Sequence, residues 1–202
     1  MSEVSAIWER IEAWYGAQGA SHLLNPAATP QAIADAEKAL SLTFPAELKE
    51  SLLRHNGTLE GHWPKGELLA LERIIHEHTI WMDILQDENS RDLADHNEDD
   101  LYLQSGWWNA GWIPLDADGA GNGAAIDTAP AEDGKVGQIL DMDHEVGPSG
   151  PIFDSLAEYL LAVARGLGAS EYTYYKNVTD DMEGICPTED LEDYIYLEDD
   201  GE

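Results

Sequence analysis

The sequence predicts a single α+β domain in which helices come first, a mainly antiparallel sheet follows, and one further helix closes the core. Three observations indicate this class. Apolar residues recur at three- and four-residue spacing near the amino terminus, short apolar runs bounded by glycine, proline or aspartate fill the middle, and a last amphipathic stretch ends at Gly166 or Gly168. With 202 residues, 43% of them hydrophobic, the chain can bury one substantial core.

Three helices are predicted in the first quarter of the chain. Thr29-Pro30 supplies an N-cap and a first-turn proline for the second helix. The third begins at Phe44-Pro45 and ends at Asn56-Gly57, since both of these last residues adopt left-handed backbone conformations readily. The first helix carries an aromatic face that we expect to be core, made of Ile7, Trp8, Ile11, Trp14 and Tyr15.

The rest of the domain is predicted to contain a fourth helix, a set of strands and a final helix. Apolar spacing from Ile74 to Leu85 first indicates a fourth helix. Pro148 and Pro151 then precede a final helix with Phe153 on its apolar side. Strands are expected at residues 68–72, 112–115, 124–128 and 136–142. Because the spacers between the last three are short, a meander is the simplest sheet.

Two segments depart from this pattern. Residues of about 87–104 are acidic with little periodicity, which predicts a loop inserted into a domain that spans residues 1–168. Residues 169–202 form an acidic extension that contains Tyr172, Tyr174 and Tyr175 and has no lysine or arginine after Lys176. We expect this extension to be partly docked on the domain and partly disordered.

The net charge restricts the classes of partner. Forty-one acidic and 10 basic side chains give a formal charge of -31, which repels nucleic-acid phosphates and anionic membrane lipids. The same field speeds encounter with a basic protein partner. The charge can equally serve solubility or adaptation to a salty cytoplasm, and composition alone leaves both interpretations open.

The cysteine content and the amino terminus indicate a cytoplasmic protein. Cys186 is the only cysteine, so an intrachain disulfide has no partner. The start Met-Ser-Glu lacks the basic and apolar regions of a signal peptide. No stretch approaches the roughly 18 consecutive apolar residues of a membrane-spanning helix.

Two glycine- and aspartate-rich motifs overlap between residues 116 and 127. Gly119 to Ala124 has the spacing of a dinucleotide-binding loop, but a strand pattern rather than a helix follows it, so a tight strand connection is the better account. Asp116, Asp118, Gly121 and Asp127 occupy positions 1, 3, 6 and 12 of a calcium loop. Ala120 at position 5 supplies no side-chain oxygen, and the aspartate at position 12 is shorter than the usual glutamate. Both departures count against calcium binding, which stays an open alternative.

The remaining candidates for chemistry are weak. His76 and His78 diverge on a helix and have no further ligands at zinc spacing. Cys186 precedes Pro187 in an acidic stretch that disfavours its thiolate. We therefore predict no catalytic residue, no cofactor and no metal, and expect the protein to act by binding rather than as an enzyme.

Candidate contact residues for a basic protein partner combine carboxylates with tryptophan. Trp107 and Trp108 follow the acidic segment, and neighbours on a strand face opposite sides, so at most one of them enters the core while the other stays available. The candidates are Asp87, Glu88, Asp92, Asp95, Glu98, Asp99, Asp100, Trp107, Trp108, Asp116 and Asp118.

The order of motifs from Trp8 to Leu167 resembles a known family. A tryptophan-bearing helix, a Pro-x-x-Leu helix followed by Asn56-Gly57, Trp112-Ile113-Pro114, and a Gly-x-x-Gly-Gln run from Gly134 to Gln138 appear in succession. This order is similar to that of the Smi/Knr family of cell-wall-assembly regulators, within the SUKH superfamily.

The resemblance implies an α+β fold and two functions. Many bacterial members of the superfamily look like immunity proteins, which implies that this chain occludes a cognate toxin stoichiometrically. The alternative is an intracellular regulatory scaffold or adaptor, as the resemblance to eukaryotic cell-wall regulators implies. The acidic segment and the extension have no counterpart in the family core.

Overall fold

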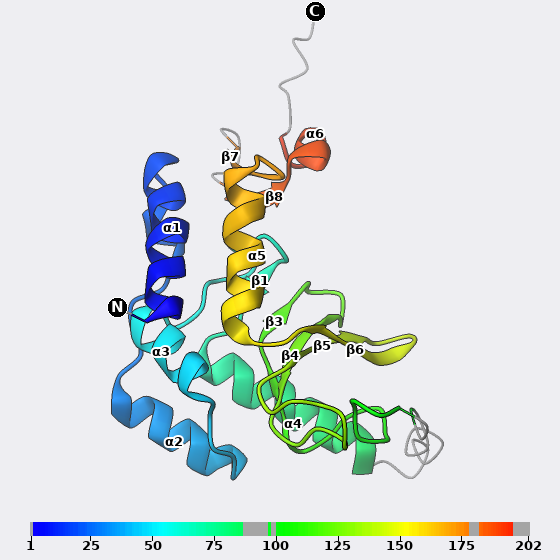
Figure 1. The fold of residues 1–202 in the computed structure, drawn as a ribbon. Helices are drawn as coiled ribbons and strands as arrows, with labels where there is room; N and C mark the ends of the chain where they lie inside the picture. Colours follow the sequence, from blue (N-terminus) through cyan, green and yellow to red (C-terminus); the bar gives the residue numbers. More distant parts are fainter. Residues whose placement is uncertain (1, 87–96, 98–99, 178–181, 196–202) are drawn as a thin grey trace, which may run out of the picture.

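The computed structural model describes residues 2–86, 97, 100–177 and 182–195 (Figure 1). Helices α1 (Glu3–Ala17) and α5 (Leu156–Gly168) lie side by side, and α3 (Ala46–Arg54) packs against both. Helix α2 (Pro30–Leu40) contacts α3 and α4 (Leu71–Gln86), and α4 also packs against the sheet at β2. The α+β class predicted from the sequence is therefore confirmed.

The helix starts follow local capping chemistry. The Ser2 hydroxyl accepts a hydrogen bond of 3.2 Å from the Ser5 amide at the start of α1. Thr29 does the same for Ala32 at 3.1 Å, with Pro30 in the first turn of α2 as predicted. A third cap, in which Ser155 accepts from the Glu158 amide, starts α5.

The main sheet is an antiparallel meander of four strands. Its order is β2 (Trp112–Pro114), β4 (Gly123–Asp127), β5 (Ile139–Asp143) and β6 (Gly147–Phe153). Strand β3 (Asp116–Ala117) leaves this sheet to pair with β1 (Glu67–Leu68). The meander predicted for residues 112–142 is present, with one further strand at its edge.

Both faces of this sheet are buried because its strands carry apolar residues on both sides. Ile113, Ile126 and Ile139 are aligned across β2, β4 and β5 and belong to the large core shared with α1, α3 and α5. Alternate residues on the other face join a smaller core with Leu103 and Trp108. That second core lies against the α4 side chains Trp81, Met82 and Leu85.

The prediction of a strand at residues 68–72 was wrong beyond Leu68, because α4 already begins at Leu71. The Asn56 side-chain oxygen accepts a hydrogen bond of 3.0 Å from the Leu71 amide. A tertiary contact thus satisfies one of the first free amides of the helix, which the local sequence does not reveal. The predicted end of the third helix was also late, since α3 stops at Arg54 and His55 is extended.

Gly57 has another role than the predicted helix stop. Its φ is 68°, and a Cβ atom there would lie 2.3 Å from the Leu68 carbonyl oxygen. The residue therefore allows the backbone of residues 68–70 to pass very close.

The start of the final helix was predicted too early. Phe153 ends strand β6, and α5 starts three residues later at Leu156. Strand β6 contains Pro148 and Pro151, which it tolerates because it lies at the edge of the sheet. Strand β5 likewise begins at Ile139 rather than at Val136, whose side chain is exposed.

The carboxyl-terminal residues form a hairpin next to the helical core. Strand β7 (Tyr172–Lys176) pairs with β8 (Glu183–Pro187), and the short helix α6 (Leu191–Tyr194) follows. The Ile185 amide donates a hydrogen bond of 2.8 Å to the Gly61 carbonyl oxygen. In the part of the chain that the structure describes, none of the helices has the length and apolar character that a membrane crossing requires.

Candidate partner-binding surface

The hairpin of β3 and β4 separates two hollows on the molecular surface. Its turn is closed by Asp118, whose Oδ1 accepts from the amides of Ala120 at 2.7 Å and Asn122 at 3.0 Å. Burial opposes ionisation of Asp118, but hydrogen bonds from Asn122 and Ala120 outweigh it and lower the pKa of the carboxyl. Asp118 is therefore a charged group at the exposed tip of the hairpin.

Asp116 anchors the base of the same hairpin. Its Oδ1 accepts from the Ala124 amide at 2.5 Å and its Oδ2 from the Tyr159 hydroxyl at 2.6 Å. The Trp63 indole donates to that hydroxyl at 2.9 Å. Burial raises the pKa of Asp116. This network joins β3, β4, α5 and the segment before β1.

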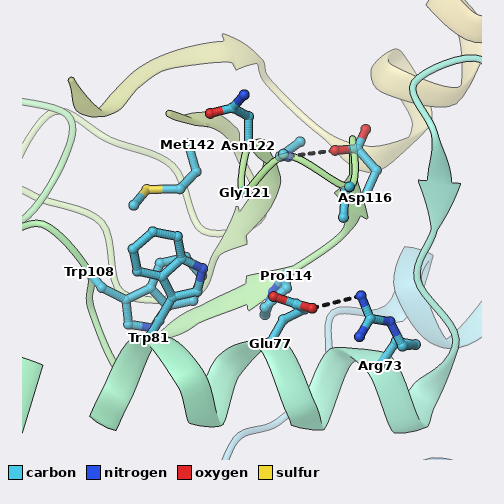
Figure 2. Close-up of a pocket in the computed structure, with 13 residues that line it drawn as sticks. Arg73, Glu77, Trp81, Trp108, Pro114, Asp116, Gly121, Asn122 and Met142 are labelled. Carbon is cyan, nitrogen blue, oxygen red and sulfur yellow. Dashed lines mark hydrogen bonds and ion pairs between the residues drawn. The ribbon is translucent and has the colours of Figure 1, made fainter. Parts of the chain in front are cut away.

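The first hollow, of about 150 Å³, lies between α4 and the hairpin and is called the aromatic hollow below (Figure 2). Arg73 and Glu77 form an ion pair of 2.8 Å along its α4 side. Trp81, Trp108 and Met142 form its apolar wall. The hollow thus pairs an apolar surface with a neutralised charge pair.

The two neighbouring tryptophans have different environments. Trp108 is stacked on Trp81 at a ring distance of 5.6 Å and meets Trp112 edge-on at 5.5 Å. It is a core side chain, only 4% exposed. Trp107 is half-buried against the same cluster and leaves part of its surface outside. Of the pair, Trp107 is the one that a partner can reach in this conformation.

The second hollow, of about 540 Å³, is called the carboxyl-terminal groove below. It runs between residues 60–66, the β3–β4 hairpin and the β7–β8 hairpin, and it shares Asp116, Asn122 and Gly123 with the aromatic hollow. Its charged and aromatic lining residues are Glu60, Lys65, Asp118, Asp141, Tyr175 and Tyr194.

The structure brings together only some of the candidate contact residues. Asp118 lines the carboxyl-terminal groove and Trp108 the aromatic hollow. Asp116 borders both but is 4% exposed, so its carboxyl serves the fold rather than a surface. Asp100 caps the amides of Tyr102 and Leu103 and lines neither hollow. The candidates Asp87, Glu88, Asp92, Asp95, Glu98 and Asp99 lie outside the described residues.

Sequence reasoning missed Glu60, Asp141 and Tyr194 as groove residues. They come from three distant parts of the chain and form no local motif. The excess of tyrosine after Gly168 was the one signal that pointed toward this region.

The three carboxyls of the calcium-loop pattern, Asp116, Asp118 and Asp127, accept hydrogen bonds from different groups of the protein. Asp127 is completely buried and accepts from the Gln138 side chain at 3.0 Å and the Ala129 amide at 2.9 Å. Burial raises its pKa. The glycine-rich turn leads into strand β4, so a phosphate would meet no helix start there.

The other residues considered for metal or thiol chemistry are His76, His78 and Cys186. Within the described ranges, no group of three or more histidine, cysteine, aspartate or glutamate side chains is arranged to hold a metal ion. His78 is buried with its Nε2 3.0 Å from the Ala110 carbonyl oxygen, while His76 is exposed. Burial also raises the pKa of the Cys186 thiol.

Comparison with known families names the class of protein to which this fold belongs. Residues 27–162 match the SMI1 / KNR4 family (SUKH-1). This range covers most of the chain, which therefore belongs to that family.

Its fungal relatives carry regulatory names. The chain is 29% identical over 179 residues to "Cell wall biosynthesis/cell cycle regulator smi1" of Schizosaccharomyces pombe, covering 80% of this chain and 35% of that protein. It is 24% identical to "Glucan synthesis regulatory protein" of Neurospora crassa, covering 84% and 39%. It is 23% identical to "Cell wall assembly regulator SMI1" of Saccharomyces cerevisiae, covering 85% and 42%. The chain thus spans well under half the length of these relatives.

Proposed function

We propose that this chain is a regulatory adaptor that acts by binding another protein. The observation that carries the proposal is the similarity over most of the chain to fungal proteins named as regulators of cell-wall and glucan synthesis. The sequence interpretation placed this function second to toxin immunity, and the relatives favour the reverse order.

The surface of the molecule supports a binding function. The β3–β4 hairpin is fixed from both sides by the Asp116 network and by the pairing of β3 with β1. A rigid hairpin between two hollows presents a surface that loses little conformational entropy when a partner docks. We expect the module to act by binding, and two of its buried carboxyls, Asp116 and Asp127, are engaged in hydrogen bonds within the fold.

Charge sets the chemistry of the proposed partner. A formal charge of -31 favours a protein with a basic surface and disfavours nucleic acid and anionic membranes. The acidic segment around residues 87–100 remains a proposed steering element, with Trp107 as an apolar anchor beside it. We place this activity in the cytoplasm.

The test is reconstitution of a complex from purified components. The full chain is used to capture proteins from its host, and the strongest candidate is then expressed alone and mixed with the chain. We expect a complex of fixed stoichiometry in analytical ultracentrifugation, with the partner's activity altered and its covalent structure intact. A partner that is chemically modified in the mixture would overturn the adaptor proposal.

Toxin immunity is the second candidate, and the strongly negative charge is compatible with it. Toxins that act on nucleic acid carry basic surfaces, to which an acidic protein is complementary. Co-expression with a toxin encoded next to this chain should restore growth and yield a complex of the two proteins. If neither occurs, the immunity candidate is to be abandoned while the adaptor proposal stands.

A further inference from the structure

The carboxyl-terminal groove is built by segments far apart in the sequence. The β7–β8 hairpin closes one side by the hydrogen bond from Ile185 to Gly61. Contact there is so close that a Cβ atom on Gly184 would lie 2.4 Å from the Gly61 carbonyl oxygen. In Figure 1 this hairpin and α6 stand at the carboxyl-terminal end of α5. The groove is therefore a feature of the docked tail together with the main domain.

The charges that line the groove are predominantly negative. Glu60, Asp118 and Asp141 contribute carboxylates, and Lys65 is the only lysine or arginine among the described residues that line it. Glu60 lies over the hairpin tip, where a Cβ atom on Gly119 would approach its Oε1 to 2.8 Å. This brings the carboxylates of Glu60 and Asp118 to the same rim.

Two of these carboxylates have no hydrogen-bond or ion-pair partner among the residues that the structure describes. Glu60 and Asp141 are exposed, and within the described part of the chain neither forms a hydrogen bond or an ion pair through its side chain. Glu183, which lines an adjoining hollow with Glu60, is by contrast paired with His22 at 2.8 Å. Glu60 and Asp141 are therefore the carboxylates that remain to pair with an outside cation.

The apolar part of the groove is aromatic. The rings of Tyr175 and Tyr194 lie 5.1 Å apart, and Tyr194 is 42% exposed. Pro64, Ile185 and Pro187 complete this wall. A tyrosine face attracts cations through its quadrupole, and a guanidinium group stacks on it while its fork binds carboxylates.

We propose that the carboxyl-terminal groove binds an arginine side chain from an extended segment of the partner protein. The guanidinium stacks on Tyr194 and pairs with Glu60 and Asp141, and the aliphatic stem of the arginine lies along Pro64. The groove rejects anionic ligands such as phosphate because its net charge is negative. This inference rests on the proposed function, since it assigns the surface that a protein partner uses.

The test uses the full chain and two short peptides in an NMR titration. The probe is acetyl-Gly-Arg-Ala-Arg-Gly-amide, and its control carries citrulline, which has nearly the same shape without the charge, in place of both arginines. We expect the arginine peptide to shift the backbone amide signals of Gly61, Lys65, Asp118 and Ile185. The citrulline peptide should leave them in place, and added salt should weaken the arginine peptide.

Two matched variants test whether the arginine peptide binds in the carboxyl-terminal groove. Glu60→Gln with Asp141→Asn should raise the Kd of the arginine peptide about tenfold, because it removes both counterions of the guanidinium. Glu9→Gln with Glu132→Gln changes the net charge equally at exposed positions outside the groove and should leave the Kd unchanged. The signals of both variants show directly that they are folded.

Three outcomes would overturn the groove proposal. They are equal binding of the citrulline peptide, shifts that map to another surface, and an unchanged Kd in the Glu60/Asp141 variant. The proposed function is tested separately, by whether the chain forms a complex with the purified partner. If that complex forms equally well with the Glu60/Asp141 variant, the groove assignment fails and the adaptor function stands.

Discussion

The Tyr159 hydroxyl of α5 donates a hydrogen bond of 2.6 Å to Oδ2 of Asp116, at the base of the hairpin that separates the two hollows. Tyr159 is 1% exposed and Asp116 4% exposed. Both groups are almost completely shielded from water, so each depends on the other and on Trp63 or Ala124 for its hydrogen bonds. The position of the proposed binding surface thus depends on a buried polar network.

Tyr159→Phe should destabilise the protein by about 2–3 kcal/mol, because it leaves the Asp116 carboxyl and the Trp63 indole without their shared partner. For a chain of this size the melting temperature should fall by about 5–10 °C. Tyr102→Phe is the matched control, since the Tyr102 ring is 46% exposed. Equal melting temperatures for the two variants would show that the network contributes nothing.

Glu183 links the carboxyl-terminal hairpin to the rest of the protein, and its shifted pKa should make the stability of the protein depend on pH. Hydrogen bonds from Tyr174 first and from His22 second lower the pKa of Glu183 to about 2. Its folded pKa is below the ordinary value of 4.5, so the stability it contributes is present above pH 4.5 and is lost as the pH falls toward 2. Glu183→Gln should therefore flatten the acid limb of the stability curve.

Tyr174→Phe tests the cause of that shift. Removing the hydroxyl that donates to Glu183 at 2.6 Å should move the pKa of the carboxyl back toward 4.5, which a carboxyl-detected NMR titration measures. The same bond raises the pKa of Tyr174 to about 12, so its tyrosinate absorbance should appear only in strong alkali. The bond to Glu183 comes from Tyr174 and not from Tyr172, so Tyr172→Phe should not alter the Glu183 titration.

Gly57→Ala should cost at least about 3 kcal/mol of unfolding free energy, because the new Cβ would overlap backbone atoms. Gly19→Ala separates this overlap from backbone strain. Gly19 has a φ of 73°, close to the 68° of Gly57, but a Cβ there would have no neighbour within 4 Å. We expect it to cost about 1 kcal/mol. Similar urea midpoints for the two variants would contradict the close approach at Gly57.

Trp108→Ala and Trp107→Ala should separate stability from partner binding. Removing the core ring of Trp108 should cost about 3–5 kcal/mol, whereas removing half-buried Trp107 should cost about 1–2 kcal/mol. If Trp107 anchors the partner, its variant should weaken the complex while remaining folded. A folded Trp107→Ala variant with unaltered affinity would remove this residue from the interface.

Local patterns in the sequence predicted much of the fold. The aromatic face of α1, the Thr29-Pro30 cap and the three central strands follow from periodicity and capping rules that operate within a few residues. The errors have tertiary causes. Helix α4 begins at Leu71, where the side chain of Asn56, 15 residues earlier, caps the first turn, and β6 forms despite two prolines because it lies at a sheet edge.

The residues of the proposed binding surface were much harder to predict from the sequence. Asp118 was selected from an acid-rich turn, and Trp107 was selected together with Trp108 because the pair follows the acidic segment. Asp118 is exposed and Trp107 is half-buried. Glu60, Asp141 and Tyr194 meet only after the chain has folded, because their proximity depends on the β3–β4 turn, the sheet register and the docked tail. No spacing rule connects such positions.

We infer that this chain acts by holding a partner and not by transforming it. The most direct measurement mixes the purified chain with its purified partner and follows both the sedimentation of the complex and the intact mass of each protein. We expect one complex of fixed stoichiometry, weakened by salt, with both masses unchanged. Multiple turnover of the partner or of a small molecule, abolished by a single substitution in the chain, would contradict it.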